Sequence, residues 1–384
     1  MRILFVTPGC FDKGGISRYS RYQITALREL WGEASVRVFS LLGKTFDSFE
    51  QDFQVSWSAG GNRGVEKCRF SLRLAKEIFL WRPDVLHVAH VNLSCLGYGL
   101  SKLIGAKSIL NTYGLEVWSG LSPDARFGLR RTQRVLSDCF FTAHYLEKRG
   151  FRPNNTTTVI WDCVDLKRFY PCKPSPAILE KYRIPGKESH FNVMTLGRLS
   201  RAAAHKGYER LLKVFSIVSS SYPKCRLIIA GKGDMRQELY GLAETLGLSE
   251  NVIFTGMVQD DHLPDVYRAA HVFSLVSDRG HNRGEGIPLT PLEAMACGIP
   301  ILVGNQDGSQ EAVEDGENGF ILDPFDFKAH AGVIERLIND KELYDRLAKG
   351  AVKRAQKEFS YRDFREKHRR LYSDLLNERQ VYER

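Results

Sequence analysis

The sequence predicts an α/β protein made of two Rossmann-like domains. Short runs rich in Val, Ile and Leu alternate with longer amphipathic runs, which is typical of parallel sheets with helices on both faces. The alternation stops at "PCKPSP" (171–176) and then restarts. In addition, 384 residues exceed the size at which a single hydrophobic core keeps growing. We therefore expect domains at residues 1–168 and 169–361, facing each other across a cleft.

Strand-forming runs recur along both halves of the chain. In the first half the predicted strands are Ile3–Thr7, Ser35–Ser40, Val85–Val88, Lys107–Thr112, Cys139–Ala143 and Thr157–Ile160. In the second half they are Phe191–Leu196, Cys225–Ala230, Val252–Thr255, Val272–Val276, Ile301–Val303 and Gly319–Leu322. Apolar residues at helical spacing near the end predict a terminal amphipathic helix over 362–384, packed back on the first domain.

The charge of the chain is distributed unevenly. The net charge is +10; residues 1–168 carry 24 Lys and Arg against 15 Asp and Glu, whereas the other 216 carry 31 against 30. This asymmetry favours an acidic partner for the first half: a membrane surface, nucleic acid or an anionic substrate. Plain solubility is the alternative explanation.

Cysteine usage and hydropathy indicate the compartment. The eight cysteines form no Cys-x-x-Cys pair and no zinc-like spacing with His, so we expect reduced thiols. No apolar run approaches the roughly 20 residues that span a bilayer. The start, "MRILFVTPG", is too short for the apolar part of a signal peptide and is typical of a buried strand. We expect a cytoplasmic protein, either free or peripheral on the inner face of the membrane.

Glycines follow several of the predicted strands. Gly14 and Gly15 lie between the first strand and the first helix, where backbone N–H groups can approach an anion. The pattern is not G-x-G-x-x-G, so it does not support a dinucleotide site, and a plain strand-to-helix turn stays equally open. "IIAGKGD" (228–234) repeats the strand-then-glycine pattern in the second half.

Two cations follow the first strand of the second half. Gly197 and Arg198 end that strand, and Lys206 lies at the entry to the next helix. Ligands of open α/β sheets bind at the carboxyl ends of the strands. Arg198 with its planar fork and Lys206 as a point charge could therefore hold a diphosphate there.

Two glutamates flank a short turn in "GEGIPLTPLEAMACGIP" (284–300). The order Thr290, Pro291, Glu293 predicts a capping box with Thr290 as the N-cap, which gives Glu293 a structural role. Glu285 has no such role in its glycine-rich turn. A hydrolase pair of carboxylates is a further alternative, but the spacing does not fix the distance that it needs.

These blocks together resemble a known family. Glu285 and Glu293 match the E-x7-E signature of the family-4 retaining glycosyltransferases of the GT-B fold, and "LEAMACGIP" (292–300) is similar to the segment that follows it. "GRL…HKG", "AGKGD" and "FTGMV" (254–258) match further blocks in the same order. The resemblance covers essentially the whole chain.

The resemblance implies a role for each matching residue. Glu285 would bind hydroxyls of the donor sugar, and Glu293 the ribose of the nucleotide. Arg198 and Lys206 would hold the diphosphate and stabilise it as the leaving group. The remaining implied donor or nucleotide contacts are Gly14, Gly15, Gly197, Val258, Pro288, Leu289 and Thr290.

Three departures from the family pattern surround the donor sugar. "NTYGLE" (111–116) aligns with a block that normally carries His where Tyr113 stands, so Tyr113 and Glu116 are candidate sugar contacts. Pro288 replaces a glycine and removes a backbone donor. The loop between Arg198 and Lys206 is longer than usual.

The resemblance implies transfer of a hexose-type sugar with retention. Arg198, Lys206 and the helix N-terminus at Thr290 would stabilise the leaving diphosphate without a metal. We expect a UDP-sugar donor and a saccharide or lipid-linked saccharide acceptor, in polysaccharide or glycoconjugate synthesis, without cofactor, metal or nucleic acid. Alternatives are a Rossmann oxidoreductase, which lacks its fingerprint here, and an epimerase, phosphorylase or non-catalytic protein that binds a nucleotide sugar on the same fold.

The first domain also predicts a membrane contact. Four arginines in "ARFGLRRTQRVL" would share one face of a helix, with apolar neighbours beside them. The arginines are Arg126, Arg130, Arg131 and Arg134, and the neighbours are Phe127, Leu129 and Val135. Because the acceptors of such enzymes bind the first domain, we expect peripheral association with anionic membranes. A solvated face with a soluble acceptor is the alternative.

Overall fold

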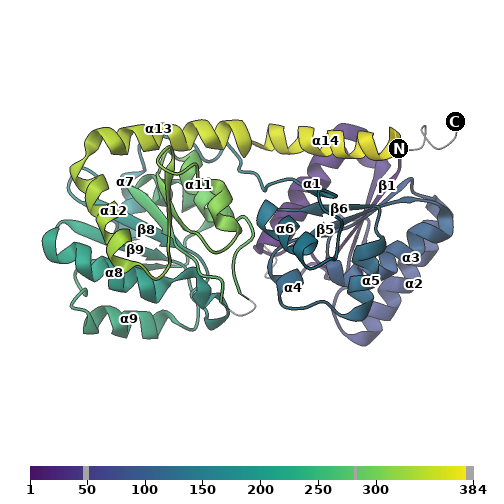
Figure 1. Ribbon diagram of the computed structural model, residues 1–384, viewed down its shortest axis with the longest axis horizontal. Coiled ribbons are helices and arrows are strands. Elements are labelled where there is room, and N and C mark those ends of the chain that lie inside the picture. Colours follow the sequence, from purple (N-terminus) through teal and green to yellow (C-terminus); the bar gives the residue numbers. More distant parts are fainter. Residues whose placement is uncertain (46–51, 281–282, 378–384) are drawn as a thin grey trace. The chain divides into compact units, whose positions relative to one another are not determined.

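The computed structural model describes residues 1–45, 52–280 and 283–377. The chain forms two compact units, one of Met1–Cys163 with Tyr361–Arg384 and one of Val164–Ser360. Each unit is a parallel β-sheet with helices on both faces (Figure 1).

The first unit contains a seven-stranded parallel sheet in the order β3-β2-β1-β4-β5-β6-β7. Its strands are β1 Ile3–Thr7, β2 Val36–Ser40, β3 Trp57–Ser58, β4 Val85–Val88, β5 Lys107–Thr112, β6 Arg134–Ser137 and β7 Thr157–Val159. Its helices are α1 Gly15–Trp31, α2 Gly64–Trp81, α3 Ser94–Ile104, α4 Leu115–Trp118, α5 Pro123–Arg131, α6 Phe140–Lys148 and α14 Tyr361–Asn377.

Strand alternation builds two cores in the first unit. Leu4 and Val6 of β1 point to a cluster that α2, α3 and α5 cover, whereas Ile3 and Phe5 point to a cluster under α1 and α14. This is the two-residue period of a strand that is buried on both faces. The terminal helix α14 thus completes the core of the first unit.

Polar contacts fix α14 on the first unit. The hydroxyl of Tyr372 is hydrogen-bonded to Nδ1 of His87 at 2.5 Å, and Nε2 of His368 lies 2.9 Å from Nε2 of Gln23. All four side chains are buried. Burial lowers the pKa of His87 to about 3 and that of His368 to about 4, so both imidazoles are neutral partners in this network. Residues 378–384 of the expected helix lie outside the described residues.

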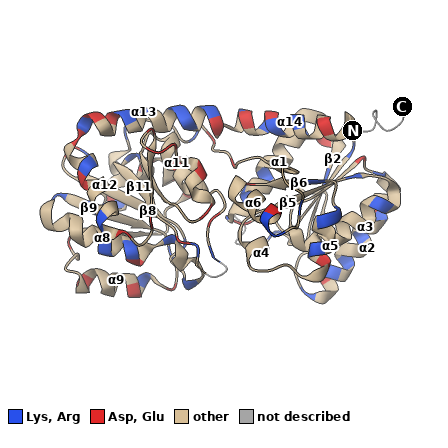
Figure 2. Cartoon of the chain, in the orientation of Figure 1, with Lys and Arg blue, Asp and Glu red and all other residues tan. Residues whose placement is uncertain are grey.

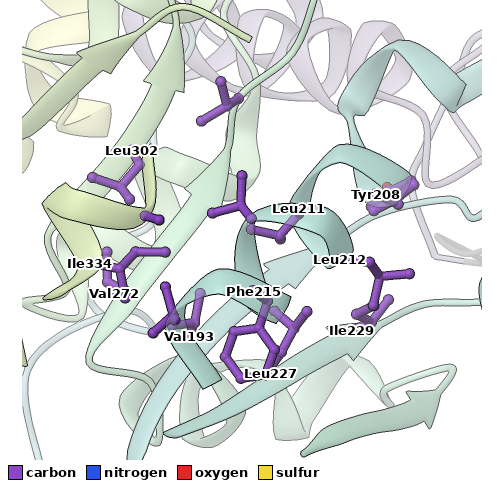
Figure 3. Close-up of a cluster of buried hydrophobic side chains, with 14 of the residues drawn as sticks. Val193, Tyr208, Leu211, Leu212, Phe215, Leu227, Ile229, Val272, Leu302 and Ile334 are labelled. Carbon is purple, nitrogen blue, oxygen red and sulfur yellow. The ribbon is translucent and has the colours of Figure 1, made fainter. Parts of the chain in front are cut away.

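The second unit contains a six-stranded parallel sheet in the order β10-β9-β8-β11-β12-β13. Its strands are β8 Phe191–Leu196, β9 Cys225–Ala230, β10 Val252–Gly256, β11 Val272–Leu275, β12 Ile301–Gly304 and β13 Gly319–Leu322. Its helices are α7 Pro176–Lys181, α8 Tyr208–Ser221, α9 Arg236–Thr245, α10 Leu263–Arg268, α11 Leu289–Ala296, α12 Phe327–Asn339 and α13 Lys341–Glu358. Figure 3 shows the core where Phe215 of α8 meets Val193 and Leu227 of the sheet.

One predicted strand is wrong. Cys139–Ala143 lies at the start of α6, and the strand is Arg134–Ser137 instead. The apolar run continues through the strand-to-helix turn, where periodicity cannot separate a buried strand from a buried helix. As a result, Arg134 belongs to β6 and does not share a helix face with the other three arginines. Leu129 and Val135 are core residues and not surface neighbours.

The two units divide between Cys163 and Val164, a few residues before the expected boundary. The backbone N–H of Val164 bonds to the carbonyl of Phe359, and the guanidinium of Arg168 forms an ion pair with Asp260 at 2.6 Å. These contacts make residues 164–168 part of the second unit, which short-range sequence patterns cannot show.

Candidate functional site

The candidate site of the second unit lies where the strand order reverses. β8 and β11 are neighbours at the centre of the sheet, and the chain leaves them toward opposite edges. The loops that follow β8 and β11 diverge at the carboxyl ends of these two strands. Open α/β sheets bind ligands at such a point. Here the loop after β8 carries His205 and Lys206, and the loop after β11 carries Glu285.

Glu285 is held by two residues of the opposite loop. Its Oε1 lies 2.6 Å from Nε2 of His205 and 2.8 Å from Nζ of Lys206, and its side chain is 16% exposed. Burial acts to raise the pKa of this carboxyl, but Lys206 and His205 outweigh burial and lower the pKa to about 2. Glu285 is therefore a fixed anion at neutral pH.

Asp307 and Gly308 together fix the backbone of Glu285. Its Oδ2 accepts the N–H of Glu285 at 2.9 Å and the hydroxyl of Ser277 at 2.7 Å. The next residue, Gly308, donates its N–H to the carbonyl of Glu285 at 2.9 Å. Asp307 is fully buried, and burial raises its pKa even though Ser309 also donates to it. No local sequence pattern indicates these contacts of Asp307, which we call the Asp307 clamp.

The two predicted cations differ in exposure. Arg198 is exposed, whereas the Lys206 side chain is 16% exposed and paired with Glu285. A Cβ at Gly197 would lie 2.4 Å from the Tyr208 hydroxyl and 3.3 Å from Cδ of Lys206, so a larger residue there would displace the Tyr208 side chain. The Tyr208 hydroxyl is buried without a hydrogen-bond partner among the described residues. Burial and the nearby Glu285 raise the pKa of Tyr208, whereas Arg198 lowers it.

Arg210 supports the loop that carries the pair. Its guanidinium forms an ion pair with Asp278 at 2.7 Å and donates to the carbonyl of His205 at 2.9 Å. Gly207, which lies between Lys206 and α8, has φ +82, and a Cβ there would lie 2.8 Å from the carbonyl of Val276. A left-handed, tightly packed glycine therefore brings α8 against the end of β11.

The predicted capping box at Thr290 is wrong. Helix α11 begins at Leu289 with Pro288 as its N-cap, and no side chain caps it. Glu293 is therefore the fifth residue of the helix and too far inside to reach its first N–H groups. Its carboxylate is 3% exposed, and Oε2 accepts the hydroxyl of Tyr267 at 2.8 Å. The hydroxyl of Thr290 is buried without a partner among the described residues.

Other predicted contacts of the second unit lie near the same edge of the sheet. Leu289 and Thr290 form the first turn of α11, which follows β11, and Val258 is a buried residue just after β10. A Cβ at Gly231 would lie 1.9 Å from the carbonyl of Gly197, so that glycine lets the loops after β8 and β9 touch.

The glycine loop of the first unit already holds a carboxylate. Helix α1 begins at Gly15 with Gly14 as its N-cap. The N–H of Gly14 and the hydroxyl of Ser17 donate to the two carboxylate oxygens of Asp12, each at 2.6 Å. An anion at this helix terminus would have to share these donors with Asp12.

Tyr113 and Glu116 are bound to their own unit. Tyr113 is 6% exposed, and its hydroxyl accepts a hydrogen bond from Nδ2 of Asn111 at 3.0 Å. The carboxylate of Glu116 accepts the backbone N–H of Tyr113. Burial raises the pKa of Glu116 to about 7, although the bond from Tyr113 opposes the shift. In this conformation the Tyr113 hydroxyl serves the core and not a ligand.

The structure therefore joins three of the predicted features and adds residues that the sequence did not single out. Glu285, Lys206 and Gly197 lie together, with Arg198 beside them in sequence. His205, Tyr208 and Asp307 were missed. His205 could have been suspected from its place directly before Lys206, whereas no local pattern marks Asp307.

Comparison with known proteins finds a family match for part of the chain. Residues 184–354 match the model of "Glycosyl transferases group 1". A GDP-mannose-dependent phosphatidylinositol monomannoside mannosyltransferase of Mycolicibacterium smegmatis is 30% identical over 248 residues, 63% of each chain. The putative glycosyltransferase EpsD of Bacillus subtilis is 28% identical over 87% of this chain and 80% of that protein. The match spans less than two thirds of the mannosyltransferase.

Solved structures share the whole fold. Anabaena HepE in complex with UDP has a TM-score of 0.78 and 20% identity, with 97% of this chain and 100% of that chain covered. Sucrose-phosphate synthase from Thermosynechococcus elongatus has a TM-score of 0.77 at 20% identity, with 98% and 99% covered. The expected fold is confirmed. Residues 184–354 therefore match the group 1 glycosyltransferase family, and the chain has the GT-B fold.

Proposed function

We propose that the protein is a retaining glycosyltransferase. It moves a hexose-type sugar from a nucleoside diphosphate sugar to a hydroxyl of a saccharide or lipid-linked saccharide, in polysaccharide or glycoconjugate synthesis. The observation that carries this proposal is the ionised Glu285, fixed between His205 and Lys206 at the point where the strand order reverses. The family and the fold support the same assignment.

The charges of the site suit a diphosphate leaving group. Negative charge develops on the diphosphate as the bond to the sugar breaks, and preorganised cations lower the energy of that state. Arg198 and Lys206 supply two positive charges after β8. The first turn of α11 adds backbone N–H groups, although Pro288 supplies none.

Glu285 suits the sugar and not the diphosphate. Its carboxylate repels phosphate, and at neutral pH it can only accept hydrogen bonds. Oε1 takes the contacts from His205 and Lys206, whereas the described residues supply none to Oε2. Oε2 would accept a hydrogen bond from a sugar hydroxyl. The Glu285–Lys206 pair would then place the sugar next to the phosphate that Lys206 holds.

The identity of the donor is open to direct test. The relatives' names point to GDP-mannose in one case and UDP in another. We propose a UDP-sugar first, with a GDP-sugar as the alternative. Thermal unfolding with UDP, GDP and ADP, each with and without its sugar, decides between them: the correct nucleotide raises the melting temperature most.

We propose that transfer requires no divalent metal, because the two side-chain cations can neutralise the diphosphate. Two turns of the second unit, 260–262 and 323–326, carry paired acids, and one acid of each has a structural partner: Asp260 pairs with Arg168, and Asp326 caps α12. Transfer should therefore persist in EDTA. Loss of activity in EDTA that Mg²⁺ restores would contradict metal independence.

The decisive experiment follows release of the free nucleoside diphosphate with and without acceptor saccharides. A glycosyltransferase releases it much faster when an acceptor is present. Binding without any release would favour a non-catalytic protein. Conversion of the donor sugar without acceptor would favour an epimerase.

A further inference from the structure

A polar hollow of about 190 Å³ lies at the start of α8, and we call it the α8 hollow. The loop after β8 contributes His205 to its wall, and the loop after β11 contributes Asp278 and Arg283. The first two turns of α8 complete the wall. Neither Lys206 nor Glu285 lines it, so the α8 hollow is a space of its own next to the candidate site.

The start of α8 offers backbone donors. The helix begins at Tyr208, and its N-cap is Gly207, which has no side chain to cap it. The first N–H groups of a helix have no partner within the helix, and together they carry a partial positive charge. In α8 the N–H of Leu211 already bonds to the carbonyl of Gly207. The N–H groups of Tyr208, Glu209 and Arg210 are therefore the donors that an anion would use at this end.

His205 indicates that a ligand belongs in the α8 hollow. The residue is 7% exposed, and its Nε2 lies 2.6 Å from Oε1 of Glu285. Because an ionised carboxylate only accepts hydrogen bonds, Nε2 carries a proton. The other ring nitrogen, Nδ1, is buried without a hydrogen-bond partner among the described residues. Since His205 lines the hollow, a ligand there would supply the partner that Nδ1 lacks.

The wall of the α8 hollow is positively charged overall. Its basic residues are Arg210, Lys213 and Arg283, and its acids are Glu209 and Asp278, so three cations against two acids leave one net positive charge. Arg210 is paired with Asp278 at 2.7 Å, whereas Lys213 and Arg283 are exposed. Figure 2 shows the basic residues of α8 in blue. Two exposed cations beside the helix donors favour an anionic ligand.

We propose that the α8 hollow binds an oxyanion, a phosphate or carboxylate group, at a site separate from the one proposed for the donor diphosphate. The N–H groups of the first turn of α8 hold its oxygens. Nδ1 of His205 donates to it once the ring carries both protons, and Lys213 and Arg283 bind it from the solvent side. Arg198 and Lys206, which we assign to the diphosphate, take no part in this site.

The oxyanion has two sources that the chemistry allows. It is either a free ion such as inorganic phosphate or an acidic group carried by a saccharide, and both use the same contacts. A metal cation is a poorer occupant, because Asp278 already pairs with Arg210 and Glu209 alone does not make a cation site. A neutral sugar would make no use of the charges of Lys213 and Arg283.

The test is titration calorimetry of the full chain with inorganic phosphate, glucose 6-phosphate, glucuronate and glucose. Each is measured on the parent, on the parent saturated with the nucleoside diphosphate that binds best, and on Arg198→Ala. Saturation fills the proposed diphosphate site, and Arg198→Ala weakens it. Because the Arg198→Ala measurement needs no nucleotide, a protein that binds no nucleotide still tests the α8 hollow. The two proposals therefore fail separately.

Two variants change the charge of the hollow in opposite directions. Lys213→Gln with Arg283→Gln removes both exposed cations, so phosphate should bind about tenfold or more weakly. Glu209→Gln removes a repelling charge, so phosphate should bind about two- to fivefold more tightly. In both variants the Kd of the nucleoside diphosphate should stay close to that of the parent.

The matched control is Arg346→Gln with Lys349→Gln. It removes one arginine and one lysine from exposed positions of α13, so the net charge changes as in the cation variant. This control should bind phosphate as the parent does. Tighter binding of glucose 6-phosphate or glucuronate than of phosphate would assign the site to an acidic saccharide, and tighter binding of phosphate would assign it to a free ion.

Any of four results overturns the proposal. The first is a parent that binds none of the three oxyanions. The second is a cation variant that binds phosphate as well as the control does. The third is phosphate binding that disappears both in the nucleotide-saturated parent and in Arg198→Ala, which would place the ion in the diphosphate site. The fourth is glucose that binds as tightly as glucuronate, which would show that the hollow does not recognise charge.

Discussion

The ammonium of Lys206 lies 2.8 Å from Oε1 of Glu285, and each side chain is 16% exposed. Lys206 has three N–H donors, and this contact occupies one of them. The others remain for a phosphate oxygen. Under the proposed function, Lys206 could therefore contact Glu285 and the diphosphate at the same time, which would couple the position of the sugar to that of the leaving group.

The first prediction concerns the cations. Arg198→Ala and Lys206→Ala should each weaken binding of the nucleoside diphosphate by about 1.5–3 kcal/mol, the contribution of a charge-assisted hydrogen bond. That corresponds to roughly a ten- to hundredfold rise in Kd by titration calorimetry. Arg201→Ala is the control, because Arg201 lies in the same loop but pairs with Glu238 at the surface. Parent-like affinity in both site variants would refute this assignment.

The second prediction separates the sugar from the nucleotide. Glu285→Gln keeps the shape of the side chain but removes its charge, so its hydrogen bond to a sugar hydroxyl weakens. Turnover should fall by about ten- to a hundredfold, with the Kd of the free nucleoside diphosphate nearly unchanged. Steady-state kinetics with the intact donor, together with calorimetry on the free nucleotide, measure the two effects. Retained turnover would show that Glu285 is structural.

The third prediction concerns pH. Glu285 ordinarily titrates near 4.5, and Lys206 and His205 outweigh burial and lower its pKa to about 2 in the folded protein. The unfolded chain therefore takes up this proton first as the pH falls. The stabilisation is complete above about 4.5 and is lost progressively toward 2. In urea unfolding, the stability difference between the parent and Glu285→Gln should shrink as pH falls from 7 to about 3. A difference independent of pH would mean that the carboxylate is not ionised in the fold.

The fourth prediction concerns Glu293. Its carboxylate is buried against the hydroxyl of Tyr267, so its structural role differs from the predicted cap. Glu293→Ala and Tyr267→Phe should each lower the free energy of unfolding by about 1–3 kcal/mol, and the double variant by less than the sum. Glu293→Ala alone should also weaken nucleotide binding if the carboxylate contacts the ribose. Full additivity in denaturant unfolding would show that the pair does not interact in the folded protein.

The fold was predictable because its central strands are buried on both faces. β1, β4, β5, β8 and β9 are buried along nearly their whole length and have the predicted bounds. β3 has two residues and lies at an edge, too short for any periodic signal. The false strand at Cys139 arose where an apolar strand passes directly into an apolar helix.

The site was predictable only in part. Arg198, Lys206 and Glu285 stand out because charged residues follow strands at the carboxyl edge of a parallel sheet. The capping box predicted at Thr290 is wrong because the helix begins at Leu289, with Pro288 as its N-cap, so that Thr290 already lies inside the helix. Asp307 follows β12, and no local pattern links it to the backbone of Glu285, 22 residues earlier. Contacts of this kind follow from tertiary packing and not from spacing.

The last prediction concerns this Asp307 clamp. Asp307 accepts hydrogen bonds through both carboxylate oxygens, from Glu285 and Ser277 at one and from Ser309 at the other. Asp307→Asn turns one acceptor into a donor, which then faces an N–H group. Stability should fall by about 1–3 kcal/mol, and turnover should fall as in Glu285→Gln because the loop no longer holds the carboxylate in place.

Ser309→Ala is the matched control for the clamp. It removes the hydroxyl donor to Asp307 but leaves the Asp307 contact with the N–H of Glu285 in place. It should lower stability and spare turnover, and in both variants the Kd of the free nucleoside diphosphate should stay close to that of the parent. The measurements are urea unfolding, calorimetry and kcat with saturating donor. If Asp307→Asn loses stability as Ser309→Ala does but keeps the parent's kcat, Asp307 holds the fold together and does not position Glu285.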